Sequence, residues 1–379
     1  MHLFLADEDS EVELRSELAL AFPGTDITSP HPLLFAIDHA ETLSPPLPAI
    51  AFARQFLPDA QAARVESIGA WARLLFDSIV GTLAEGRPWR LHIEPHYGAR
   101  PVRRMGARAW HTTRQRKEPA IVGHAKDQSS DFTASDAGRQ RCQLIREALK
   151  ELLHKKRRHL LRHLFESSQP FGEDASLVQL LLTAPGSGFI SIASAPAPFL
   201  HRQLLSPFPK GQITIPPDLT APSRAFAKLV EAELRLGRGI QPGETCVDLG
   251  AAPGSWTFVA VNRGATVIAV DRSRLREDMM VNPRVQFVPG DAFGFHPRRS
   301  VDWLLCDVIA PPDRSAQLLL EWLRRGWCRR FVVTLKLKDE LGINVLDVLK
   351  RDLPPLTSEL LLSHLCANKK EACVMGTRR

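Results

Sequence analysis

Short apolar runs alternate with helix-period segments from Ser223 onwards. The apolar runs suit buried strands, and the segments between them repeat apolar positions at intervals of three and four residues. Expected strands are Thr245–Leu249, Thr266–Val270, Val285–Val288, Val301–Cys306, Phe331–Leu335, Glu359–Leu365 and Ala372–Met375, and expected helices are Ser223–Leu236, Ser255–Asn262, Arg314–Arg325 and Asp339–Lys350. This order predicts an α/β fold with a doubly wound, mostly parallel sheet.

The front half of the chain mixes shorter strands and helices. Expected strands are Leu3–Leu5, Leu33–Ile37, Ala51–Phe56, Trp89–Pro95, Val178–Leu182 and Gly188–Ala193, and expected helices are Val12–Phe22, Val65–Leu83 and Arg139–Leu164. Six prolines within residues 197–222 mark a linker. We therefore expect four parts: an α+β unit (1–58), a second region (59–196), the linker (197–222) and the α/β domain (223–379).

Charge is distributed unevenly along the 379 residues, whose formal net charge is +7. Residues 100–162 contain seventeen Lys/Arg against six Asp/Glu, whereas residues 1–59 contain two against ten. A local positive excess favours a polyanion such as nucleic acid, because each neutralised phosphate releases a counterion. The alternative is a solvated basic face, which is the commoner interpretation of a charged run.

Cysteine and histidine spacing and the hydropathy of the chain indicate which covalent, metal-binding and membrane features to expect. The six cysteines contain no C-x-x-C pair, which argues against a disulfide framework and a zinc site. We expect no metal, because the spacings of His111, His124, His154 and His159 do not converge. The chain starts without a signal-peptide pattern, and no segment approaches 18 uninterrupted apolar residues. A cytoplasmic protein that does not span a membrane is expected.

The segment Val247–Trp256 joins an apolar strand to a turn of small residues. Gly250 and Gly254 lack the side chains that would keep a backbone turn away from a ligand. Asp271 ends the next strand, where a rigid acceptor could bind ribose hydroxyls. The alternative interpretation is that the glycines only allow the strand and helix to pack tightly. The presence of Asp271 at the end of the next strand counts against this alternative. The segment is not G-x-G-x-x-G, which argues against a nicotinamide cofactor.

Charged residues follow or adjoin the buried strands of this domain. Asp307 and Lys336 each come at the end of an apolar run, Lys228 lies in the helix before the first strand, and Glu371 precedes the last strand. A lysine at the end of a buried strand is costly unless a carboxylate pairs with it. An ordinary structural ion pair remains the alternative at this point.

These four residues resemble the Lys-Asp-Lys-Glu tetrad of FtsJ-like RNA ribose 2′-O-methyltransferases. Within that class, the chain is most similar to the bacterial 23S rRNA methyltransferase family RlmM. The motifs that carry the resemblance are Phe52-Ala-Arg-Gln55, Ala221-Pro-Ser-Arg-Ala-Phe-Ala-Lys228, Asp248-Leu-Gly-Ala-Ala-Pro-Gly-Ser-Trp-Thr257, Gly326-Trp-Cys328 and Leu335-Lys-Leu337. Ala252 and Ser255 stand where the family has Cys and Gly, a change that keeps the turn glycines.

The resemblance implies a ferredoxin-like unit and a THUMP-type RNA-binding region ahead of a Rossmann-like domain that uses S-adenosylmethionine. It implies that the target is a cytidine of 23S rRNA or its precursor. The implied catalytic residues are Lys228, Asp307, Lys336 and Glu371. The implied cofactor-binding residues are Asp248, Gly250, Gly254, Trp256, Asp271 and Asp291, of which Trp256 suits core packing equally well.

The ribose hydroxyl is a poor nucleophile, so it must be aligned with the methyl donor and relieved of its proton. Lys336 is the candidate base, assisted by Lys228, while Asp307 and Glu371 would orient it and hold the hydroxyl. The rivals are methylation of another RNA or of a base nitrogen, and a non-catalytic RNA-binding or ribosome-assembly protein. A base methyltransferase would need an aromatic clamp after Asp307, and Pro311-Pro312 is followed by none.

Overall fold

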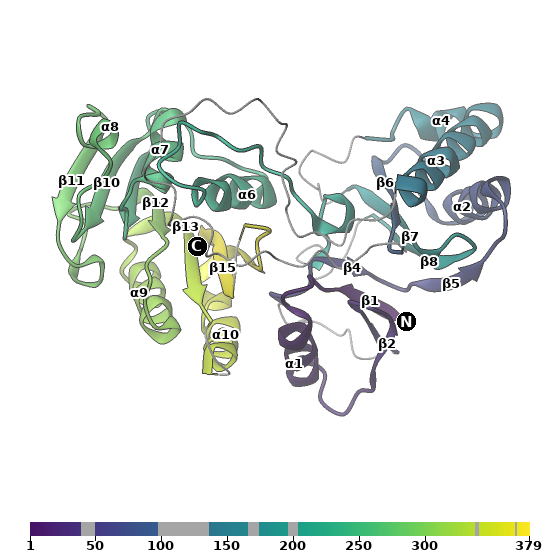
Figure 1. Cartoon of the computed structure of the whole chain (residues 1–379), viewed down its shortest axis with the longest axis horizontal. Coiled ribbons are helices and arrows are strands. Elements are labelled where there is room, and N and C mark those ends of the chain that lie inside the picture. Colours follow the sequence, from purple (N-terminus) through teal and green to yellow (C-terminus); the bar gives the residue numbers. More distant parts are fainter. Residues whose placement is uncertain (39–49, 98–135, 166–173, 196–203, 338–340, 368–369) are drawn as a thin grey trace, which may run out of the picture.

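The computed structural model describes residues 1–38, 50–97, 136–165, 174–195, 204–337, 341–367 and 370–379. Three separate sheets organise these residues (Figure 1). His111 and His124 lie outside the described residues, as do all of the basic residues between 100 and 135 and the first part of the predicted linker. None of the described helices is long and apolar enough to cross a membrane.

The C-terminal sheet has seven strands in the order β11-β10-β9-β12-β13-β15-β14. Its strands are β9 (Thr245–Leu249), β10 (Thr266–Asp271), β11 (Val285–Pro289), β12 (Val301–Cys306), β13 (Cys328–Lys336), β14 (Thr357–Ser363) and β15 (Glu371–Arg378). The strands β9 to β13 are parallel to one another, whereas β15 pairs antiparallel with both β13 and β14. The predicted α/β class with a large, mostly parallel sheet is confirmed.

Helices cover both faces of this sheet (Figure 1). They are α6 (Phe226–Leu236), α7 (Ser255–Asn262), α8 (Glu277–Met280), α9 (Pro312–Arg325) and α10 (Leu341–Asp352), with short 3₁₀ turns η4 (Ala292–Gly294) and η5 (Pro354–Leu356). Alternate residues of β12 explain the two layers. Trp303 and Leu305 pack in the core formed with α6 and α7, and Leu304 and Cys306 pack in the core formed with α9 and α10.

The N-terminal unit is a four-stranded antiparallel sheet in the order β2-β3-β1-β4. It contains β1 (His2–Leu5), α1 (Glu11–Ala21), β2 (Ile27–His31), β3 (Leu34–Ile37) and β4 (Gln55–Leu57). The strand predicted over residues 51–56 begins only at Gln55. The backbone N–H groups of Ala51 and Phe52 donate instead to the buried carboxylate of Glu17, at 2.8 and 3.0 Å.

The second region contains a four-stranded sheet in the order β5-β8-β7-β6. It contains β5 (Gln61–Arg64), α2 (Ile68–Thr82), β6 (Trp89–Pro95), α3 (Asp136–Lys156), α4 (Arg158–Leu161), β7 (Ser176–Ala184) and β8 (Ser187–Ala193). The single helix predicted over residues 139–164 is two helices, because Arg157 has a non-helical backbone (φ −147°, ψ 51°).

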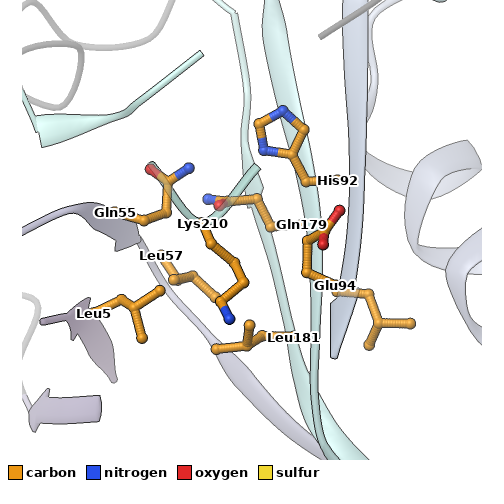
Figure 2. A pocket seen from close by; sticks show the side chains of 9 residues that line it. Leu5, Gln55, Leu57, His92, Glu94, Gln179, Leu181 and Lys210 are labelled. Carbon is orange, nitrogen blue, oxygen red and sulfur yellow. The ribbon is translucent and has the colours of Figure 1, made fainter. Parts of the chain in front are cut away.

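A small cavity with both apolar and polar lining residues lies where these two sheets meet the turn η3 (Pro209–Gly211) (Figure 2). Lys210 extends past Leu57 towards Leu181, and Gln55, His92, Glu94 and Gln179 supply the polar lining. Burial raises the pKa of Glu94, although Arg146 and Lys210 oppose that shift. Lys210 has a left-handed backbone (φ 54°). The cavity contains none of the residues predicted for the functional site.

Candidate functional site

The turn after β9 needs its two glycines. Gly250 (φ 75°) and Gly254 (φ 107°) both lie in the left-handed region, which side-chain-bearing residues rarely adopt. A Cβ on Gly250 would lie 2.5 Å from Cγ2 of Val308, and a Cβ on Gly254 would lie 2.9 Å from Cγ of Met279. Glycine therefore lets the turn pass close to the residue that follows Asp307.

Two acids stand beside this turn at the carboxyl ends of neighbouring strands. Asp271, the last residue of β10, accepts from Ala252 N at 3.0 Å and from Ser273 N at 2.7 Å. Asp291 follows β11, accepts from Phe293 N at 3.3 Å and pairs with Arg272 at 3.1 Å. Both side chains are thus held at the edge of the sheet where ligands bind in doubly wound folds.

Asp248 and Trp256 lie beneath the turn. Asp248 is 1% exposed and accepts a 2.6 Å hydrogen bond from the Thr257 hydroxyl. Burial raises the pKa of Asp248 to about 7, against the opposing effect of its hydrogen bonds from Thr257. Trp256 is 2% exposed, and its indole N–H donates to Ala225 O at 2.9 Å. These contacts fasten the first turn of α7 to β9 and to the start of α6.

The four residues of the predicted tetrad converge on one point. Lys228 Nζ, from α6, lies 3.2 Å from Asp307 Oδ2 and 2.6 Å from Glu371 Oε2. Lys336 Nζ, at the end of β13, lies 2.5 Å from Asp307 Oδ1 and 3.0 Å from Glu371 Oε1. Lys336 and Glu371 are partners in the antiparallel register of β13 and β15. Each lysine therefore contacts both carboxylates.

The cluster is largely shielded from water, since its four side chains are only 9–16% exposed. Burial lowers the pKa of Lys228, but Asp307 and Glu371 outweigh it, so the net shift is upwards. Burial likewise raises the pKa of Asp307, and Lys336 and Lys228 reverse the shift to below its usual value. Because two cations pair with two anions, these four side chains can stay charged although they are largely buried.

Two hydroxyl contacts at the site were not predicted. Thr334 Oγ1 donates to Asp307 Oδ1 at 2.6 Å, and Ser223 and Ser255 join their hydroxyls at 2.7 Å. A signal for Thr334 was present in the sequence, because Thr334 and Lys336 are two residues apart on one strand and so share a face. The Ser223–Ser255 contact joins segments 32 residues apart and had no local signal.

Residues 221–346 match the family model for FtsJ-like methyltransferase. Similar curated proteins are named "Ribosomal RNA large subunit methyltransferase M". That of Thauera aminoaromatica is 35% identical over 183 residues, which cover 45% of this chain and 50% of the relative. That of Halorhodospira halophila is 47% identical over 120 residues, covering 31% and 35%. That of Azotobacter vinelandii is 46% identical over 127 residues, with the same coverage.

The chain therefore spans half the length, or less, of the curated relatives that it matches. The matched part contains the glycine turn and three of the four clustered side chains, Lys228, Asp307 and Lys336. Residues 221–346 are accordingly similar to an FtsJ-like methyltransferase domain, and they contain most of the mostly parallel sheet.

Proposed function

We propose that the chain is an S-adenosylmethionine-dependent RNA methyltransferase that acts on a ribose 2′-hydroxyl of large-subunit rRNA. The observation that carries this proposal is the convergence of Lys228, Asp307, Lys336 and Glu371 at the carboxyl edge of the sheet. A purely structural ion pair would need one lysine and one carboxylate. Two lysines and two carboxylates, largely shielded from water and close to a turn of the cofactor-binding type, favour a site for proton transfer.

The residues at the glycine turn fit S-adenosylmethionine. Gly250 and Gly254 carry no side chain that would keep the amino-acid end away from the backbone of the turn, and Asp271 stands where ribose hydroxyls would lie. Asp291 would accept from the adenine amino group, and the buried Asp248 and Trp256 would support the turn from beneath. When bound, this cofactor supplies an electrophilic sulfonium methyl group.

The tetrad would align the acceptor hydroxyl and manage its proton. In its neutral form, the Lys336 amine has two N–H donors, which Asp307 and Glu371 can accept, and one lone pair that remains for the acceptor hydroxyl. The hydroxyl would donate its proton to this lone pair as its oxygen attacks the methyl carbon, so that Lys336 would become an ammonium while the sulfur keeps the electrons of the broken sulfur–carbon bond. The carboxylates set the direction of Lys336, so alignment accounts for much of the expected rate gain.

The front half would bind the RNA. The antiparallel order β2-β3-β1-β4, with α1 between β1 and β2, supports a ferredoxin-like assignment for residues 1–58. Residues 59–196 would form a THUMP-type region, with a proline-rich linker (197–222) leading to the methyltransferase domain. Exposed cations at the end of α3, including Lys155 and Lys156, are available to RNA phosphates.

The test uses purified chain, S-adenosylmethionine labelled in the methyl group, and 23S rRNA from cells that lack the protein. We expect label at one ribose, that of a cytidine in 23S rRNA or its precursor, and its position can be mapped because 2′-O-methylated linkages resist alkaline cleavage. Label on a base nitrogen would favour the rival methyltransferase. RNA binding without any label would favour a non-catalytic assembly protein.

A further inference from the structure

The segment that leads into Glu371 is held by the N-terminal unit. His364 follows β14, and its backbone N–H donates to Ala51 O at 2.7 Å. Its ring lies 5.8 Å from the Phe52 ring and 3.8 Å, through Nε2, from Asp7 Oδ2. His364 is 3% exposed. His364, which follows a strand of the C-terminal sheet, thus packs against the N-terminal unit.

The other ring nitrogen of His364 contacts the backbone of the tetrad residue. Nδ1 lies 2.8 Å from the backbone oxygen of Glu371. A carbonyl oxygen can only accept, so Nδ1 carries the proton and donates. Burial lowers the pKa of His364, with the hydrogen bond to Glu371 acting in the opposite direction, so the neutral ring is favoured. The donor is consequently fixed on the side that faces Glu371.

Neighbouring contacts fix both sides of this segment. Arg54 donates to Asp7 Oδ2 at 2.5 Å and to Cys366 Sγ at 3.5 Å. The Cys366 N–H donates to Glu231 Oε2 at 2.8 Å. Glu231 lies on α6 three residues after Lys228. The same short segment therefore bridges the N-terminal unit and the helix that carries one tetrad lysine.

Residues 51 and 52 are themselves anchored across the domain boundary. Their N–H groups bind the carboxylate of Glu17, which is 1% exposed and pairs at 2.7 Å with Lys350 of α10. The N-terminal unit is therefore tied to the methyltransferase domain at a second point, and Ala51 O is held in place to receive the N–H of His364.

We propose that His364 is a positioning residue for the tetrad: it transmits the docked position of the N-terminal unit to Glu371. The donor on Nδ1 fixes the first residue of β15 so that its carboxylate reaches both lysines. The N-terminal unit then contributes to assembling the acceptor site, in addition to any contact with RNA. This inference rests on the function proposed above.

The test compares two substitutions of His364. His364→Leu removes the donor and keeps an apolar side chain, whereas His364→Asn places an amide N–H near the position of Nδ1. We expect kcat for rRNA methylation to fall about tenfold in the Leu variant and to return to within threefold of wild type in the Asn variant. The cofactor Kd and the KM for RNA should change less than twofold in both.

His96→Leu provides a matched control. His96 is also buried, with a ring nitrogen 2.7 Å from a backbone oxygen, that of Pro32, but it lies in the front half of the chain. The kcat of the His96→Leu variant should equal that of the wild-type protein. Undiminished kcat in His364→Leu, or equal losses in the Leu and Asn variants, would overturn the positioning role.

Hydrogen exchange separates this inference from the proposed function. Backbone amides from Glu371 to Val374 should exchange faster in His364→Leu than in wild type, and His364→Asn should restore their protection. If the wild-type protein methylates no RNA, the proposed function fails whatever the exchange shows. If the wild-type protein is active but exchange and kcat are unchanged by His364→Leu, only the positioning role fails.

Discussion

Replacing Gly250 with alanine tests how closely the glycine turn must approach the strand end that carries Asp307. The left-handed backbone at φ 75° costs a residue with a Cβ about 1–2 kcal/mol. The new Cβ would also lie 2.5 Å from Val308 Cγ2, and overpacking of this kind costs about 1–3 kcal/mol. Reduced freedom of the unfolded chain returns at most about 1 kcal/mol.

We therefore expect Gly250→Ala to lower the free energy of unfolding of the methyltransferase domain by about 2–4 kcal/mol. Urea unfolding followed by tryptophan fluorescence measures this change. The same substitution made in a Val308→Ala background should cost only about 1–2 kcal/mol, because the nearest clashing methyl group is gone and the backbone cost remains. Cofactor affinity, measured by calorimetry, should fall in the single variant.

Two results would refute this reasoning. An equal cost of Gly250→Ala in both backgrounds would mean that Val308 does not limit the space at the turn. A cost below about 0.5 kcal/mol, the scale of neutral surface changes, would mean that the left-handed backbone is not required either.

Three further predictions concern the cofactor acid, the buried acid and the basic helix. Asp271→Ala should weaken S-adenosylmethionine binding about tenfold or more in calorimetry, since a charged hydrogen-bond acceptor is lost; an unchanged Kd would contradict this. Because burial raises the pKa of Asp248 to about 7, its stabilising effect is complete below the unfolded pKa of about 3.9 and is lost as the pH rises through 7. Asp248→Asn keeps an acceptor for Thr257, so its Tm relative to wild type should rise between pH 5 and pH 8, and a constant difference would refute the assignment. Lys155→Gln combined with Lys156→Gln should reduce the slope of log K for RNA against log salt by about two, whereas an unaltered slope would remove these residues from the interface.

Local patterns predicted the C-terminal domain well because each buried strand there is a continuous apolar run. Asp307 and Lys336 could be placed at one edge of the sheet, since parallel strands end together. Glu371 was harder to predict. Its strand is antiparallel, so it meets the tetrad at the start of β15 and not at its end.

The contacts between units could not be predicted from the sequence. The apolar run at residues 51–56 resembles a strand, but Glu17 captures two of its N–H groups from another element. Asp248 has the spacing of a ligand-binding acid, and only the fold shows that its carboxylate is buried against Thr257. Such long-range hydrogen bonds leave no periodic signal in the chain.

The most direct test of the central claim is the methylation rate of Lys336→Ala on rRNA from cells that lack the protein. Removal of the proposed base should lower kcat by roughly 10²–10⁴-fold, the usual contribution of general base catalysis. Cofactor affinity should change less than twofold, because Lys336 contacts Asp307 and Glu371 and does not belong to the glycine turn. Full activity in this variant would contradict a ribose-methylating tetrad centred on Lys336.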